Sequence, residues 1–104
     1  MSNETETREL LIIGAGPAGY PAAFHAADLG MRVTLVDPEP DPGGVCLYRG
    51  CVPSKALLHV ATFLHDVEQA GQWGVSVKTD HVDTKKLVQW KDSVVKRLTK
   101  GLGQ

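Results

Sequence analysis

The feature that most constrains the fold is a glycine-rich turn, G-A-G-P-A-G at residues 14–19, which follows an apolar run at 10–13. A continuous apolar run that ends at glycine is typical of a strand buried on both faces of a parallel sheet. Gly14 allows a tight turn, Gly16 lets a pyrophosphate approach the backbone, and Gly19 allows close packing of a helix on the strand. The spacing therefore predicts a strand–turn–helix unit that binds a dinucleotide phosphate.

Residues 17–30 are predicted to form the helix of this unit. Its alanines, at positions 18, 22, 23, 26 and 27, make a small-residue face that allows close approach to a sheet. Gly30 is the expected C-cap. Pro21 removes a backbone donor just beyond the first turn of a helix begun at Pro17, so we expect a late start or a slight bend.

A second strand is predicted at residues 32–36, and Asp37 stands at its carboxyl end, 18 residues beyond Gly19. A carboxylate at this place accepts hydrogen bonds from a ribose hydroxyl and repels a 2′-phosphate. The turn and the acid together favour a bound dinucleotide over a turn that serves the fold alone. They do not distinguish FAD from NAD.

Three further elements are expected. A helical region at about 45–70, interrupted near residues 52–53, has its buried stripe at Leu57, Val60, Ala61, Leu64 and Val67. Residues 73–79 are expected to form a short strand or an extended segment. A last helix, capped by Asp83 or Thr84, directs Leu87, Trp90, Val94 and Leu98 inward.

The two cysteines of the chain, Cys46 and Cys51, are five residues apart in the predicted helical region. On a regular helix their Cα atoms are about 8–9 Å apart, whereas a disulfide needs roughly 4.4–6.8 Å. Either the helix is distorted there or the pair is not bridged. Gly50 and Pro53 supply the means of distortion, and a helix start favours a thiolate, so we infer a reactive disulfide.

Two other roles for the cysteines remain open. A metal site would need further ligands, and His59 and His65 are the nearest candidates. The pattern C-x2-C is absent, however, and two histidines six residues apart do not share a helix face. Two unpaired structural thiols are the second alternative. No metal ligand is assigned.

Composition describes a soluble globular domain and restricts its partners. The chain has 104 residues, 42% of them hydrophobic and 22% charged, with a net charge of −1. This charge gives no argument for a nucleic acid or an anionic membrane as partner. Residues 1–9 are polar and acidic, unlike a signal or transit peptide, and no apolar run approaches the roughly 20 residues of a membrane helix. We expect a cytoplasmic protein with a flexible tail at 1–9.

The expected fold class is α/β, and the domain at 10–104 is expected to be incomplete. Two parallel strands covered by helices need further strands to bury their remaining edges and faces. The last predicted helix reaches almost to Gln104. We therefore expect the chain to be the N-terminal part of a larger domain.

The run G-G-V-C-L-Y-R-G-C-V-P-S-K at residues 43–55 resembles the redox-active segment of the pyridine nucleotide–disulfide oxidoreductases. Within this family it is most similar to the dihydrolipoyl dehydrogenase branch, as are G-P-A-G-Y at 16–20 and A-A-D-L-G at 26–30. The resemblance extends over nearly all of residues 10–104. It implies a Rossmann-like FAD-binding domain, with parallel strands and packed helices, that is incomplete here.

The resemblance also implies a role for each motif residue. Cys46 corresponds to the interchange thiol, and Cys51 to the thiolate that lies against the flavin and gives a charge-transfer interaction. Lys55 corresponds to the lysine near the reactive nitrogen of the flavin ring, although without the motif it is a solvated helix lysine. The residues implied to bind the cofactor are Gly14, Gly16, Pro17, Ala18, Gly19, Asp37, Gly44, Val45, Cys51 and Lys55.

The implied reaction oxidises dihydrolipoamide through the dithiol and FAD, with NAD+ as the final acceptor. The implied partners are lipoyl domains of 2-oxo acid dehydrogenase complexes and a second subunit. The catalytic His–Glu pair of the family has no counterpart among the four histidines of this chain, which are His25, His59, His65 and His81. We therefore expect the 104-residue chain alone to be inactive and to bind FAD weakly or not at all.

Two alternatives to this function stay open. One is a related disulfide reductase of the mercuric or glutathione type, although Ser54 argues against glutathione reductase, where lysine is more frequent. The other is a non-catalytic, truncated gene product. If the chain fails to fold cooperatively, it is a decayed gene product. If it captures a partner specifically through Cys46, it is a functional thiol-bearing module.

Overall fold

The structure is a computed structural model that describes residues 5–104. Two strands and four helices follow one another along the chain, with a short 3-10 turn, η1, before the last helix. Their order is β1 (Leu10–Ile13), α1 (Gly19–Asp28), β2 (Val33–Val36), α2 (Gly44–Arg49), α3 (Cys51–Gln69), η1 (Ala70–Trp73) and α4 (Thr84–Leu102). The fold is therefore α/β, as predicted.

The N-terminal tail predicted at residues 1–9 is described only in part. Residues 1–4 lie outside the described residues, and residues 5–8 form no helix or strand. Arg8 and Glu9 approach the second strand: Arg8 Nε donates to Thr34 Oγ1 at 3.0 Å, and the N–H of Arg32 donates to Glu9 Oε2 at 2.8 Å. The end of the tail is thus hydrogen-bonded to the sheet.

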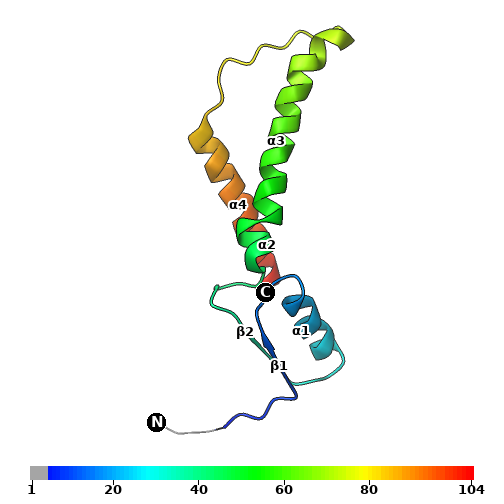
Figure 1. The fold of residues 1–104 in the computed structure, drawn as a ribbon, viewed down its shortest axis with the longest axis vertical. Helices are drawn as coiled ribbons and strands as arrows, with labels where there is room; N and C mark the ends of the chain where they lie inside the picture. Colours follow the sequence, from blue (N-terminus) through cyan, green and yellow to red (C-terminus); the bar gives the residue numbers. More distant parts are fainter. Residues whose placement is uncertain (1–4) are drawn as a thin grey trace.

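Strands β1 and β2 pair in parallel, from Leu10 opposite Val33 to Ile13 opposite Val36. Helix α1 connects them and covers one face of the pair (Figure 1). Leu10 and Ile12 are half-buried, but Leu11 is 59% and Ile13 is 83% exposed. The prediction that β1 is buried on both faces is therefore wrong for one face, because no described element covers it.

Helix α1 starts late, as the position of Pro21 predicted. It begins at Gly19, so Pro21 is its third residue and lies in the first turn, where no intrahelical donor is needed. Gly30 has φ +88° and ends the helix: its N–H donates to Ala27 O at 2.9 Å, and the N–H of Met31 donates to Ala26 O at 3.1 Å. This pair of bonds is a Schellman motif.

The small-residue face of α1 is narrower than predicted. Ala23 and Ala26 are buried, at 5% and 7% exposure, whereas the other three predicted members are exposed: Ala18, Ala22 and Ala27. The two buried alanines are three residues apart and lie on one side of the helix. Only this side meets the sheet.

The second helical region is divided at Gly50 and not at the predicted residues 52–53. Gly50 has φ −129° and ψ −104°, which ends α2 and begins α3. Pro53 is the third residue of α3, where its missing N–H costs no hydrogen bond. The Ser54 N–H donates to Gly50 O at 3.0 Å and closes the first turn. The glycine provides the break, and the proline fits inside the next helix.

The buried stripe of α3 is shifted relative to the prediction. Ala56 is buried and Val60, Leu64 and Val67 are half-buried, whereas Leu57 is 41% exposed. Ala61 is also exposed. Helix α4 covers α3 along one side only (Figure 1), so Leu57 and Ala61 share an apolar face without a covering element.

The segment predicted as a strand or extended at 73–79 forms no strand. Trp73 ends η1 and is 65% exposed, and residues 75–83 form neither helix nor strand. Gly74 has φ +78° and turns the chain out of the helical region. The alternation of Val75 and Val77 suits a strand, but the described residues supply no neighbouring strand for it to pair with.

Helix α4 begins as predicted at the Asp83 cap, whose Oδ1 accepts from the Lys86 N–H at 3.0 Å. Its inward face differs from the prediction. Val95 and Thr99 are buried and Leu87 and Val94 are half-buried. Two predicted inward residues are exposed instead, Trp90 at 41% and Leu98 at 45%. The C-terminal half of α4 packs beside α2 and α3, and only that half is well covered (Figure 1).

The described chain is extended. Its radius of gyration is 20.6 Å, with extents of 69 × 30 × 18 Å, whereas a compact domain of this length has about 13 Å. Its accessible surface is 8021 Å², against roughly 5,700 Å² for a compact monomer of the same mass. The α/β unit lies at one end and the α3–α4 pair at the other (Figure 1). None of the described helices is both long and apolar enough to cross a membrane.

Replacing the cap residue of α4 tests the start of this helix. Asp83→Ala removes the acceptor for the Lys86 N–H and is expected to cost about 1 kcal/mol of helix stability. Urea or thermal unfolding followed by circular dichroism measures the loss. Asp80→Ala is the matched control, since the Asp80 side chain is 100% exposed and caps no helix. Equal stability of the two variants contradicts the capping role.

Candidate functional site

The glycine turn connects β1 to α1, and its three glycines meet different constraints. Gly14 has φ +102°, and its N–H donates to Val36 O at 2.7 Å. A Cβ on Gly19 overlaps the carbonyl oxygen of Gly14. A Cβ on Gly16 meets its nearest atom, the Gly44 Cα, only at 3.9 Å, an ordinary contact distance. The fold thus needs glycine at 14 and 19. At Gly16, in contrast, there is space beside the backbone that a ligand group can approach.

Two further residues of the turn, Pro17 and Ala18, lie on the surface. With Gly16 they line an open groove beside the start of α1. The first N–H groups of a helix have no intrahelical acceptor, and they carry a partial positive charge. The groove is therefore suited to an anion such as a phosphate.

Asp37 is held by two backbone donors. Its Oδ2 accepts from the Ala15 N–H at 2.7 Å and its Oδ1 from the Glu39 N–H at 2.9 Å. These bonds, the one from Ala15 first, lower the pKa of Asp37 below its ordinary value of 3.8, against a small opposing effect of desolvation. Each carboxylate oxygen keeps a lone pair. The side chain can therefore accept a further hydrogen bond from a ligand hydroxyl without losing its place.

The peptide of Ala15 joins the turn to the second helical region. Ala15 is 2% exposed. Its N–H donates to Asp37, and its carbonyl oxygen accepts from the Gly43 N–H at 2.8 Å. One buried residue thus bonds the acid on one side and the loop that precedes α2 on the other.

Gly44, the first residue of α2, touches the glycine turn directly. It has φ +60°, and a Cβ there lies 2.5 Å from the Gly16 Cα. Any other residue at 44 forces the two backbones apart. The start of the cysteine-bearing helix and the glycine turn are therefore in backbone contact.

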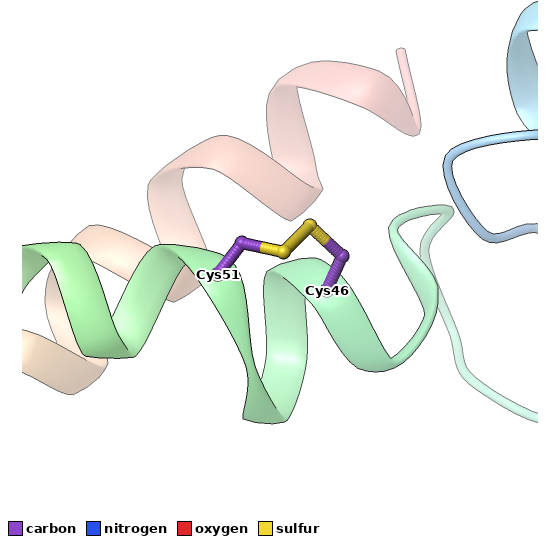
Figure 2. Close-up of a disulfide and its surroundings, with 2 residues drawn as sticks. All are labelled: Cys46 and Cys51. Atoms are coloured by element: carbon purple, nitrogen blue, oxygen red, sulfur yellow. A yellow bond between two sulfur atoms is a disulfide. The ribbon is translucent and has the colours of Figure 1, made fainter.

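Cys46 in α2 and Cys51, the first residue of α3, form a disulfide across the break at Gly50 (Figure 2). Their Cα atoms are 4.7 Å apart, well inside the separation expected for a regular helix. The predicted distortion of the helix is therefore confirmed. A Cβ on Gly50 meets the Val45 carbonyl oxygen at 3.2 Å and the Cys46 Cα at 3.5 Å, so the absence of a side chain there lets the turn close.

The two cysteine residues differ in exposure. Cys46 is half-buried, whereas Cys51 is exposed. Lys55 lies one helical turn beyond Cys51 and is exposed at a groove between α3 and α4, and Val45 is 69% exposed. Among the described residues no three His, Cys, Asp or Glu side chains gather where they could hold a metal ion.

Two interactions that join α2 to the loop after Asp37 were not predicted from the sequence. Arg49 Nη2 lies 2.5 Å from Glu39 Oε1, and the Tyr48 hydroxyl donates to Asp41 O at 3.1 Å. The Arg49 guanidinium also lies 5.9 Å from the centroid of the Tyr48 ring. The only sequence signal is an acidic loop followed ten residues later by a basic side chain, and this signal is common by chance.

Taken together, the site is a disulfide whose helix begins in contact with the glycine turn, and the same turn is hydrogen-bonded to the carboxylate of Asp37. Such a site can exchange two electrons with a thiol pair. It can also hold a nucleotide close to the disulfide, since the turn and the disulfide-bearing helix are in contact. A phosphate site alone or a disulfide alone does not need this contact.

Comparison with known proteins gives one family and many relatives of one kind. Residues 8–102 match the pyridine nucleotide-disulphide oxidoreductase family. The chain is 47% identical over 94 residues to the dihydrolipoyl dehydrogenase of Buchnera aphidicola subsp. Schizaphis graminum, covering 90% of this chain and 20% of that protein. The dihydrolipoyl dehydrogenase of Thermus scotoductus is 47% identical over 97 residues, covering 93% and 21%.

A third relative, the dihydrolipoyl dehydrogenase of Vibrio parahaemolyticus, is 44% identical over 102 residues, which cover 98% of this chain and 21% of that protein. The chain thus spans about a fifth of the length of the curated relatives that it matches. The similarity includes the turn, the acid and the disulfide segment.

Gly44→Ala tests the contact between the turn and α2. The new Cβ strains a left-handed residue and also strikes the Gly16 Cα. Gly74→Ala is the matched control, because Gly74 has φ +78° and open space around its Cβ position. We expect Gly44→Ala to lose about 1–3 kcal/mol more in chemical denaturation than the control. Equal losses contradict a tight contact.

The hydrogen bonds of Asp37 predict a pH-dependent contribution to stability. Since the folded-state pKa of Asp37 lies below 3.8, its contribution is present above about pH 4 and is lost as the pH falls through the folded pKa. Asp37→Asn is therefore expected to be less stable than the unaltered chain at pH 7, with the difference shrinking toward pH 2. Urea midpoints across this range measure it. A difference that stays constant contradicts the assignment.

Proposed function

The chain belongs to the pyridine nucleotide-disulphide oxidoreductase family, and we propose that it supplies the reactive disulfide and part of the FAD site of a dihydrolipoyl dehydrogenase. The observation that carries the proposal is the backbone contact between the glycine turn and the helix of Cys46. Identity of 42–47% to relatives with this name supports it, and a mercuric or glutathione reductase is the alternative within the family. A non-catalytic product of a truncated gene remains the alternative to an active enzyme.

The residues of the turn fit the ADP half of FAD. The groove at Gly16, Pro17 and Ala18 offers a helix start to the pyrophosphate. Asp37 is ionised at neutral pH and has a lone pair on each oxygen for a ribose hydroxyl. Its charge also disfavours a 2′-phosphate. Gly14 and Gly19 shape the turn that brings these groups together.

The residues around the disulfide fit the flavin half. Gly44, Val45, Cys51 and Lys55 are the proposed flavin contacts. Val45, Cys51 and Lys55 are exposed in the described chain, and so are free to meet a ring system. The Lys55 ammonium favours negative charge on the group that it approaches. When bound, FAD supplies two-electron chemistry between the dithiol and NAD+.

Cys46 is the proposed point of attack by the substrate. A thiolate of dihydrolipoamide bonds to Cys46 Sγ, the disulfide breaks, and Cys51 leaves as a thiolate. The second substrate thiol then displaces Cys46 Sγ, giving the lipoamide disulfide and two reduced cysteines. Cys51 begins a 19-residue helix, which stabilises its thiolate and makes it the better leaving group.

The setting of the reaction is proposed from the same resemblance. We expect lipoyl domains of 2-oxo acid dehydrogenase complexes as partners, a homodimer as the active assembly, and the cytoplasm as the compartment. The site offers no argument for a nucleic acid or membrane partner. The NAD site and the acid–base pair of the relatives have no proposed counterpart here, so the 104-residue chain by itself is expected to lack dehydrogenase activity.

Reduction by dihydrolipoamide tests the proposed chemistry. The oxidised chain is incubated anaerobically with the dithiol, alkylated, and weighed by mass spectrometry. We expect two alkylated cysteines, Cys46 and Cys51, and stoichiometric lipoamide. Cys46→Ser and Cys51→Ser are the controls, since neither can form the internal disulfide. A disulfide that resists excess dihydrolipoamide contradicts the proposal, as does lipoamide formation that survives both substitutions.

A further inference from the structure

The charges of the chain are segregated. Helix α4 carries six of the eleven Lys and Arg residues and only one of the twelve Asp and Glu residues. The rest of the chain has five basic and eleven acidic residues. A net charge near zero therefore conceals one strongly basic helix and an acidic remainder.

Five of the basic side chains of α4 share one exposed face, defined here as the cationic face: Lys85, Lys86, Lys96, Arg97 and Lys100. At 100° per residue they occupy an arc of about 120°, and they extend over about 22 Å of the helix. Val95 and Thr99, on another side, are buried. The sixth basic residue, Lys91, is half-buried and lies 2.5 Å from Asp92.

The cationic face is not neutralised within the described residues. The ion pairs found there join Arg8 to Glu6, Arg32 to Glu9, Arg49 to Glu39, His81 to Asp80 and Lys91 to Asp92, and none includes a member of the face. Five like charges on one helix repel one another. Such a surface gains free energy when it meets an anionic partner.

One member of the cationic face, Arg97, lies beside the two helices that carry the disulfide. Arg97 lines a surface groove with Leu47 of α2 and with Val52, the residue after Cys51. It also lines the neighbouring groove of Lys55 and His59. The C-terminal half of α4, drawn orange to red in Figure 1, lies beside α2 and the first turns of α3. A partner bound to this half is therefore beside Cys46 and Cys51.

We propose that the cationic face of α4 is a docking surface for an acidic protein that presents its thiol pair to the Cys46–Cys51 disulfide. This inference rests on the proposed function for the reaction and on the charges of α4 for the partner. The face attracts acidic carriers and concentrates them at the disulfide, an effect worth 10- to about 1,000-fold in rate for strong complementarity.

An acidic protein fits this surface better than an anionic membrane or a nucleic acid does. Membrane binding by an amphipathic helix needs its apolar side in the lipid, but that side of α4 is turned partly toward α2 and α3, where Val95 and Thr99 are buried. A nucleic acid carries its charge far beyond the roughly 22 Å of the face. The length of the face matches one side of an ordinary protein interface of about 800 Å².

Two reduced peptides test the proposal on the oxidised chain. Both contain the same pair of cysteines, one among glutamates and the other among glutamines. For each peptide, the rate at which it reduces Cys46–Cys51 is divided by the rate at which it reduces a small neutral disulfide. This ratio removes differences in the intrinsic reactivity of the peptide thiols. We expect the glutamate peptide to be at least about tenfold faster at low salt, with the advantage lost near 0.5 M salt.

A matched pair of variants locates the effect. Lys96→Gln/Arg97→Gln removes two charges beside the disulfide, and Arg32→Gln/Lys78→Gln removes two elsewhere, so the net charge is equal. We expect only the first variant to lose the glutamate advantage, while circular dichroism and the rate with neutral dihydrolipoamide stay unchanged in both. The neutral dithiol reports the proposed function separately from docking.

Three outcomes overturn the docking proposal. One is an equal effect of the two variants, which indicates net charge alone. Another is a glutamate advantage that persists in high salt. The third is the absence of an advantage together with binding of phosphatidylserine vesicles or salt-sensitive self-association, which assigns the face to a membrane or to a second copy.

Discussion

The structure depends on the backbone of one buried residue, Ala15. Its N–H holds the carboxylate of Asp37, and its carbonyl oxygen holds the Gly43 N–H. The contact of Gly44 with Gly16 lies next to it. The Arg49–Glu39 ion pair and the Tyr48–Asp41 hydrogen bond also join α2 to the loop after β2, in a chain that extends over 69 Å (Figure 1). Together these contacts fix the position of the disulfide relative to the glycine turn.

The disulfide segment is not a continuous helix, because it is broken at Gly50. A regular helix separates Cys46 from Cys51 by too great a distance, and a break at Gly50 brings their Cα atoms to 4.7 Å. The break makes Cys51 the first residue of a long helix, where a thiolate is stabilised. The same local geometry thus forms the disulfide and favours the direction in which it opens.

The sequence allowed the local elements to be predicted because their causes are local. The turn at 14–19, the late start imposed by Pro21 and the cap at Asp83 each depend on a few neighbouring residues. The glycine spacing and Asp37 likewise predicted a site at the carboxyl ends of the two strands; the structure brings the turn and Asp37 together there, and the binding of a ligand stays a prediction.

The covered faces were predicted less well. Periodicity identifies which residues share a helix face, but whether another element covers that face depends on the rest of the fold. Leu57, Trp90 and Leu98 are apolar and correctly spaced, and yet they are exposed in an extended chain. The pairing of Arg49 with Glu39 depends on how a proline-rich loop returns, which no local pattern encodes.

The central claim is that Cys51 lies against the flavin and Cys46 faces the substrate. The most direct measurement is the visible absorption spectrum of the native protein that contains this chain, loaded with FAD, for Cys46→Ser and Cys51→Ser. The account predicts a long-wavelength thiolate–flavin band in Cys46→Ser, where Cys51 is free, and none in Cys51→Ser. The same spectrum in both variants, or a band in Cys51→Ser alone, contradicts it.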